Sequence, residues 1–170
     1  MFNFEPQFKS VRELLEQDAE APLTDEEFDG ELWQLLCQRT REPQDLHDLA
    51  SAVGVYYASR FVQWEVGNGG FAQAALNIPQ WFALAAAGYE ELGKGKSAAL
   101  IREAMRLLPS ERLELEDKGL FGATVGPIFE HFSESQMAEL DAQIDEEDWY
   151  VDADRVRYVR ANRATFAAVE

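Results

Sequence analysis

Apolar side chains recur at spacings of three and four residues along most of the chain, which is the period of an amphipathic helix. The longest such series joins Leu46, Leu49, Val53, Tyr57, Phe61 and Trp64. No run of residues alternates between apolar and polar types over the length of a half-buried strand. The pattern predicts an all-α fold, in a single compact domain of roughly seven to nine helices over residues 1–170.

Short-range signals predict the helix ends in the first half of the chain. Val11, Leu14 and Leu15 indicate a short first helix. Thr24 and Glu27 have the spacing of a capping box, which opens a helix that buries Phe28, Leu32, Leu35 and Leu36. The next helix begins near Pro43, which suits a first helical turn. It ends at Gly67-Asn68-Gly69-Gly70, because consecutive glycines favour positive φ and chain reversal.

Similar signals divide the second half. Pro79 begins a helix that turns Trp81, Phe82, Ala85, Tyr89 and Leu92 inward, and Gly93-Lys94-Gly95 ends it. We expect Pro109 to stop the following helix, which buries Leu100, Ile101, Ala104, Leu107 and Leu108. Ser133 to Gln136 reads as a second capping box, opening a helix with Met137, Leu140 and Ile144. A last helix is expected to carry Val156, Val159, Phe166 and Val169.

The net charge of −17 is concentrated in two stretches that contain no lysine or arginine. One runs from Glu13 to Gln38, and the other from Gly119 to Asp154 includes the run Asp145-Glu146-Glu147-Asp148. The one basic cluster, Arg155, Arg157, Arg160 and Arg163, directly follows this run and is suited to ion pairs with it. A concentrated acidic field repels nucleic acid and membrane surfaces and attracts basic proteins. We therefore expect a basic protein partner, with no direct nucleic-acid or membrane binding.

Composition and motifs give little support for enzymatic chemistry. The single cysteine, Cys37, fits a reducing compartment, and the N-terminus lacks the features of a signal peptide, so we expect a cytoplasmic protein. The two histidines, His47 and His131, belong to no zinc or di-iron motif and are expected at the surface or at helix ends. The carboxylates from Asp148 to Asp154 lack the glycine and terminal glutamate of an EF-hand. We expect no enzyme activity, no metal and no cofactor.

The stretch around Gly69-Gly70 is the least generic part of the sequence. It resembles the signature of a bacterial family of all-α domains of unknown function at Glu65, Val66, Asn68, Gly69, Gly70, Phe71, Gln73 and Asn77. The helix after Pro79 and the pair Leu140-Asp141 are also similar to that family. The resemblance covers Leu46 to Phe166, which divides the chain into N-terminal acidic helices (1–45) and a family-like core (46–166).

The resemblance implies an all-α fold. It also implies one candidate function, beside others. One family member is described as a dimeric DNA mimic, whose surface carboxylates imitate phosphates and occupy the DNA-binding face of a transcription regulator. For this chain it implies that role and a homodimer. The motif itself is interpreted as structural: Asn68 to Gly70 form a turn, Phe71 fills a core, and Gln73 and Asn77 tie off loop backbone groups.

Helix geometry allows such mimicry. Phosphates of B-DNA follow one another at about 3.4 Å of axis on each strand, and helical carboxylates four residues apart lie about 6 Å apart along the axis. Glu134, Asp141, Asp145 and Asp148 have spacings that predict one acidic stripe on the helix after Ser133. The predicted partner-binding residues are Asp145, Glu146, Glu147, Asp148, Asp152, Asp154, Glu134 and Asp141, with a second patch of Asp25, Glu26, Asp29 and Glu31.

Two other functions stay open at this point. A small-molecule-binding or enzymatic domain would use a pocket near the glycine motif, lined by Trp64, Asn68, Gln73 and Trp81. An immunity or antitoxin-like protein would share the acidic surface and neutralise a basic toxin. The acidic faces are also those that any amphipathic helix turns to solvent.

Overall fold

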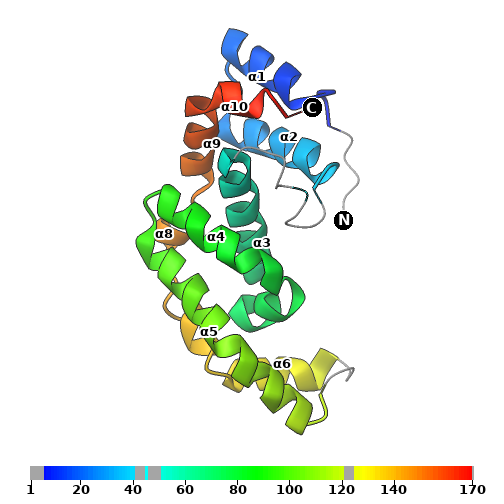
Figure 1. Ribbon diagram of the computed structural model, residues 1–170, viewed down its shortest axis with the longest axis vertical. Coiled ribbons are helices and arrows are strands. Elements are labelled where there is room, and N and C mark those ends of the chain that lie inside the picture. Colours follow the sequence, from blue (N-terminus) through cyan, green and yellow to red (C-terminus); the bar gives the residue numbers. More distant parts are fainter. Residues whose placement is uncertain (1–5, 41–44, 46–50, 121–124, 170) are drawn as a thin grey trace. The chain divides into compact units, whose positions relative to one another are not determined.

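The computed structural model describes residues 6–40, 45, 51–120 and 125–169, which form helices joined by turns (Figure 1). The helices are α1 (Val11–Glu20), α2 (Asp25–Cys37), α3 (Ser51–Asn77), α4 (Pro79–Glu91), α5 (Gly95–Asp117), α6 (Val125–Glu134), α7 (Ala138–Asp141), α8 (Glu146–Trp149), α9 (Asp152–Ala161) and α10 (Arg163–Phe166). No strand occurs in these described ranges, and the all-α class predicted from the periodicity is confirmed. None of the described helices is both long and apolar enough to cross a membrane.

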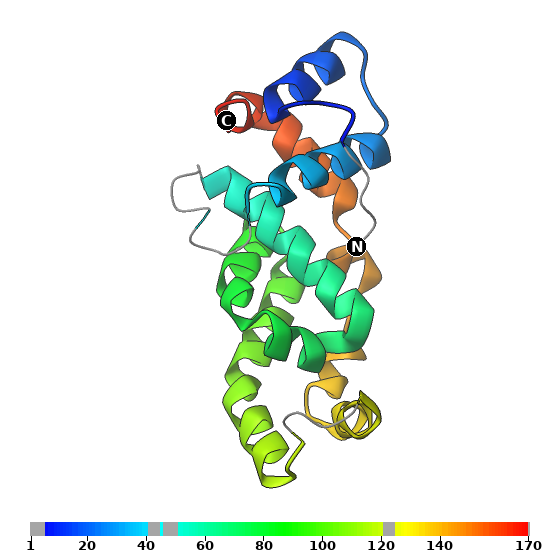
Figure 2. The same ribbon diagram turned by 90° about the vertical axis from the view of Figure 1, so that its right-hand side faces the viewer.

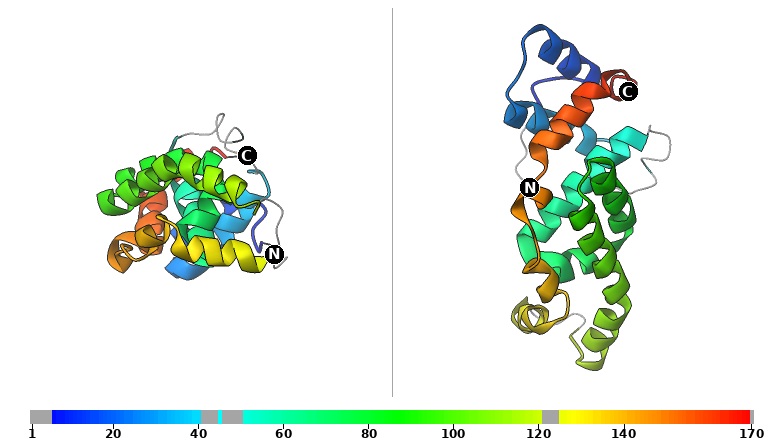
Figure 3. Two further views of the ribbon diagram at one scale, coloured as in Figure 1. Left: turned by 90° about the horizontal axis from the view of Figure 1, so that it is seen from below. Right: turned by 90° about the vertical axis from the view of Figure 1, so that its left-hand side faces the viewer.

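The helices gather into two compact units. The first unit comprises the described residues up to Tyr57 and from Val151 onward, so that α9 and α10 join the N-terminal helices. In it, α1 packs against α2 and α10, and α2 packs against α9 (Figure 1). The second unit, Ala58–Tyr150, holds the rest of α3 and α4 to α8. There α4 lies along α5, as the right-hand view of Figure 3 shows, and α8 packs on α5.

Local sequence signals set the helix ends of the first unit as predicted. The Thr24 hydroxyl accepts from the Glu27 N–H at 3.2 Å, and the Glu27 carboxylate accepts from the Thr24 N–H at 3.0 Å, which confirms the capping box. The expected apolar face of α2 is buried, and the Tyr56 ring packs edge-on against Phe166 at a centroid distance of 6.2 Å. The expected helix start at Pro43 and the positions Leu46 and Leu49 lie outside the described residues.

The glycine motif breaks α3 inside the second unit. Gly70 has φ +76° and ψ 176°, a region of backbone space that is essentially restricted to glycine. A Cβ atom at Gly70 would lie 2.5 Å from the Asp141 Oδ2 atom, so the neighbour also excludes a larger residue. Phe71, the first residue after the break, is fully buried and meets the Trp149 ring at 5.3 Å. The helix is thus interrupted at Gly69 and Gly70, and Phe71 lies in the core of the second unit.

Pro109 does not end a helix, contrary to the prediction, because α5 continues through it to Asp117. A proline inside a helix removes one hydrogen bond and costs about 3 kcal/mol. Packing beyond Pro109 offsets this cost, since Glu111 and Leu115 are both buried on the same face of α5. The end of the α4 helix was predicted correctly: Gly93 follows it with φ +78°.

The segment from Ser133 to Trp149 also differs from the prediction. Ser133 lies in the last turn of α6, a helix that the periodicity did not identify, and its hydroxyl donates to the Glu130 carbonyl at 2.8 Å. It therefore does not cap a new helix. The single turns α7 and α8 follow instead of one long helix, so Glu134, Asp141, Asp145 and Asp148 do not form a helical stripe. Similarly, the expected last helix is divided into α9 and α10.

Candidate partner-binding surface

The run from Asp145 to Asp148 lies on α8 in the second unit, and two of its carboxylates have structural partners. Asp145 caps α8 by accepting from the Glu147 N–H at 3.2 Å, and it pairs with the Lys96 ammonium at 2.9 Å. The hydrogen bond and charge of Lys96 lower the pKa of the Asp145 carboxyl. Asp148 is half-buried and accepts from the Ser97 N–H at 2.8 Å. These two residues attach the acidic turn to α5.

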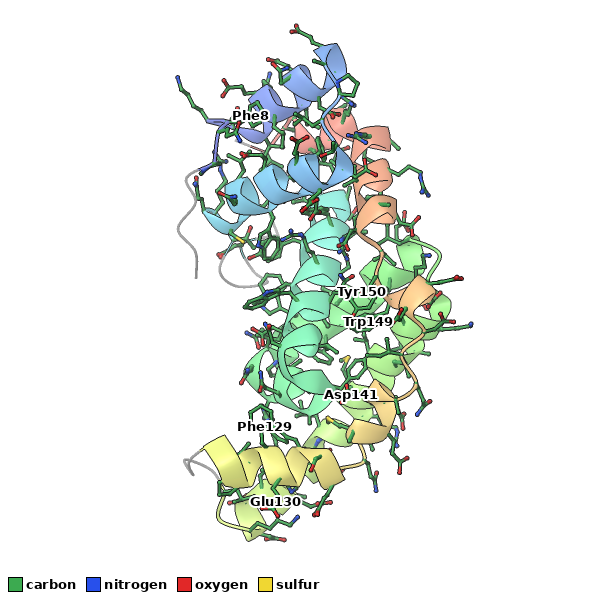
Figure 4. The ribbon with its side chains drawn as sticks, turned by 180° about the vertical axis from the view of Figure 1, so that it is seen from behind. Phe8, Phe129, Glu130, Asp141, Trp149 and Tyr150 are labelled. Atoms are coloured by element: carbon green, nitrogen blue, oxygen red, sulfur yellow. The ribbon has the colours of Figure 1, made fainter. Side chains whose placement is uncertain are left out.

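The turn is also fixed by its backbone and by an aromatic anchor. The Lys94 ammonium donates to the Glu147 carbonyl at 3.1 Å, and the Ser97 hydroxyl donates to the Asp148 carbonyl at 2.9 Å. Trp149, which is labelled in Figure 4, is buried and stacks on the Tyr89 ring at a centroid distance of 5.3 Å. The Tyr89 hydroxyl donates to the Trp149 carbonyl at 2.9 Å. The acidic turn is thus held in one orientation.

Glu146 and Glu147 are the exposed pair on this fixed turn. Within the described part of the chain, neither carboxylate makes a hydrogen bond or an ion pair. Glu26 on α2 and Glu134 on α6 are exposed in the same way. These four are the predicted contact residues whose charge is most available to a partner.

The first unit holds Asp152 and Asp154, which the sequence grouped with the run 145–148. Asp152 forms an ion pair with the buried Arg155, and Asp154 pairs with Arg157 at 2.8 Å. These ion pairs of Arg155 and Arg157 are therefore with acids of their own helix, whereas the prediction placed them with the run Asp145 to Asp148. The contiguous acidic stretch nevertheless divides between the two units after Tyr150.

Most of the second predicted patch, on α2, is engaged inside the first unit. Asp25 pairs with Arg160 at 2.6 Å. Glu31 is half-buried and accepts from the Gln7 N–H at 2.8 Å. Asp29 is 7% exposed and accepts from the Tyr56 hydroxyl at 2.8 Å, so it is a core residue and not a surface contact.

Asp18 is a charged core residue that was not among the predicted contact residues. Its side chain is buried between Arg160, at 2.9 Å, and Arg163, at 2.5 Å. Burial alone would raise the pKa of the Asp18 carboxyl, but the hydrogen bonds from Arg160 and the Leu23 N–H and the two arginine charges outweigh it and lower the pKa. The sequence does carry a signal, since position 18 continues the apolar spacing of Val11, Leu14 and Leu15.

Asp141 belongs to the glycine motif and not to a surface stripe. It is half-buried, and its Oδ1 atom accepts from the Phe71 N–H at 2.9 Å, which caps the part of α3 after the break. Burial raises the pKa of the Asp141 carboxyl, and the Phe71 hydrogen bond offsets part of that rise. Asn77 donates to the Glu65 carboxylate at 3.4 Å instead of to a loop backbone group, and Gln73 lies against Gly69.

A buried polar network joins α5 and α6 in the second unit. His131, 4% exposed in the last turn of α6, has its Nε2 atom 2.7 Å from the Glu111 carboxylate. Its Nδ1 atom is 3.0 Å from the Lys118 ammonium. His131 is therefore at a helix end, as expected, but buried. The signal for Glu111 was its place in the apolar spacing of Ala104, Leu107 and Leu115.

The residues expected to line a pocket do not converge. Trp64 is 56% exposed and Asn68 is exposed, whereas Trp81 is 1% exposed beneath Phe61. A groove of about 540 Å³ lies elsewhere, between α5 and residues 136–143. Among the residues that the structure describes, no group of three or more His, Cys, Asp or Glu side chains is placed to hold a metal ion.

Comparison with known proteins identifies the family. No curated protein and no solved structure matches the chain. The family model described as DMP19-like protein matches residues 47–162, which is more than half of the chain and nearly the whole region of the resemblance. The match includes the break at Gly70, its cap Asp141 and the acidic turn of α8. The chain belongs to the DMP19-like protein family.

Proposed function

We propose that this chain is a non-enzymatic, acidic binding protein that occupies the DNA-binding surface of a basic protein, as a DNA mimic does. The observation that carries the proposal is the pair Glu146 and Glu147. Both are exposed and adjacent, and in the described ranges neither carboxylate makes a hydrogen bond or an ion pair, on a turn whose neighbours are fixed. Arginine and lysine groups that bind phosphate oxygens bind carboxylates through the same charge-assisted hydrogen bonds.

The rigidity of the turn supports binding. Ordering side chains and loops at an interface costs free energy, and a surface that is already ordered avoids part of that cost. Here Asp148 and Trp149 fix the turn before any partner arrives. Family membership also supports the proposal, because one member of the family that this chain resembles is described as a DNA mimic. The resemblance further implies a homodimer, which sedimentation at several protein concentrations would test.

The test is binding to a panel of purified helix-turn-helix domains, with duplex DNA as competitor. We expect at least one domain to bind at low salt, to be released as salt rises, and to be displaced by DNA, because both ligands use the same basic surface. The double variant Glu146→Lys/Glu147→Lys should lose this binding. Glu16→Lys/Glu20→Lys, which changes two exposed acids of α1 by the same total charge, is the matched control.

Each outcome separates the candidate functions. Equal loss in both double variants would mean that net charge, not the α8 turn, governs binding. If no domain is retained at low salt, or if the α8 variant binds as the wild type does, the proposal is wrong. Binding that duplex DNA does not compete away would mean that the DNA-binding surface of the partner is not the one occupied, and would favour the immunity or antitoxin-like function.

A further inference from the structure

Helix α6 turns four exposed side chains to one side: Phe129, Glu130, Ser133 and Glu134, which we call the α6 face. Residues three and four apart in a helix are neighbours on its surface. Phe129 and Ser133 therefore form one edge of the face, and Glu130 and Glu134 form the other. Phe129 is 50% exposed although its ring is large and apolar (Phe129 and Glu130 are labelled in Figure 4).

The opposite side of α6 is fixed to α5. Figure 2 views α6 nearly end-on, next to the C-terminal part of α5. His131 and Phe132 are both buried, and His131 lies between Glu111 and Lys118. A lysine ammonium can only donate, so the Nδ1 atom of His131 accepts from Lys118 and the Nε2–H donates to Glu111. This network fixes which side of α6 faces outward.

The chemistry of the α6 face suits an arginine side chain. A guanidinium is planar, stacks on aromatic rings and donates to carboxylates in a fork. The Phe129 ring offers the stacking surface, and Glu130 and Glu134 offer carboxylates on the other edge. Ser133, on the same edge as Phe129, is small, and its hydroxyl donates to the Glu130 carbonyl at 2.8 Å. No lysine or arginine occurs from Gly119 to Asp154 to neutralise the face from within this stretch.

We infer that the α6 face binds an arginine-bearing segment of the basic partner, with the guanidinium over Phe129 and its donors directed to Glu130 or Glu134. The inference rests on the proposed function and adds a second contact to the α8 turn. It also adds selectivity. A lysine ammonium is a compact point charge that meets the carboxylates but makes no planar stack, so arginine binds more tightly than lysine.

The test uses a fluorescent helical peptide with arginines four residues apart, and its twin with lysine at the same positions. Anisotropy titrations at low salt give both dissociation constants. We expect the wild-type protein to prefer the arginine peptide by about two- to five-fold, the range of an exposed cation–π contact. Phe129→Leu keeps an apolar side chain without the ring and should abolish the preference. Glu130→Gln/Glu134→Gln should weaken both peptides alike, because it removes charge but not the ring.

Leu113→Ala is the control, since Leu113 is another exposed apolar residue, on α5, at 61%. Circular dichroism checks that every variant is folded. An unchanged arginine preference in Phe129→Leu would overturn the inference. If the α6 variants bind both peptides as the wild type does while Glu146→Lys/Glu147→Lys loses helix-turn-helix binding, the inference falls and the proposed function stands. If the α8 variant retains that binding, the proposed function falls, whatever the peptides show.

Discussion

Carboxylates have different structural roles in the two units. In the first unit, Asp18 and Asp25 bind Arg160, and Asp152 and Asp154 bind arginines of α9. In the second unit, Asp141 and Asp148 accept backbone N–H donors, and these bonds position elements whose other acids remain exposed. The carboxylates of the first unit thus mostly form contacts that stabilise the fold. The acidic surface that can meet a partner is smaller than the sequence indicates, and the second unit offers its best-fixed part.

The largest effect should come from Gly70, where the second unit depends on backbone geometry and not on charge. We expect Gly70→Ala to lower the free energy of unfolding by about 3 kcal/mol, because alanine is strained at this φ and ψ. Its Cβ would also displace the Asp141 carboxylate that caps Phe71. Urea unfolding followed by circular dichroism gives the change.

Gly30 supplies the control for this substitution. It lies within α2 with no atom near the position of an added Cβ. Gly30→Ala should raise stability by up to about 1 kcal/mol, since alanine is the better helix former. Equal stability of Gly70→Ala and the wild type would show that the break in α3 does not organise the second unit.

The acid dependence of stability should have opposite signs for Asp18 and Asp141. The pKa of Asp18 is lowered in the folded protein, so its stabilising effect is present above the unfolded pKa of about 3.9 and is lost as pH falls through the folded pKa. Asp18→Asn should cost about 2 kcal/mol at neutral pH, because it leaves two partly exposed arginines without their carboxylate. That difference should shrink below about pH 4.

The pKa of Asp141 is raised instead, so its ionised form costs stability above the folded pKa, and this cost disappears in acid. An asparagine at this position would keep an acceptor for the Phe71 N–H, so Asp141→Asn should gain stability relative to the wild type at neutral pH and lose that gain on acidification. Urea unfolding of both variants and the wild type between about pH 3 and pH 7 measures the two slopes. Slopes of the same sign would contradict the distinction between the two carboxylates.

The sequence predicted those parts of the fold that local chemistry decides. The capping box at Thr24 and the break at Gly70 depend on neighbouring residues, so both were readable. The continuation of α5 through Pro109 could not be predicted from the sequence, because it depends on packing between α5 and residues that are distant along the chain. Among the proposed contact residues, the sequence pattern singled out Glu146 and Glu147 but could not separate them from Asp29. Asp29 is buried because its carboxylate bonds to the Tyr56 hydroxyl, and Tyr56 lies 27 residues further along the chain.

The smallest expected effect comes from removing a single carboxylate charge from each unit and comparing the loss of binding. Asp25→Asn and Glu147→Gln remove the same charge from exposed residues with little change of shape. We expect Glu147→Gln to weaken binding of a retained helix-turn-helix domain by about two- to five-fold, as for a solvent-exposed ion pair. Asp25→Asn should change the affinity by less than about two-fold, because Arg160 already binds that carboxylate. Anisotropy titration against the same domain compares them, and equal losses would mean that the first unit contributes to the binding surface as much as the second.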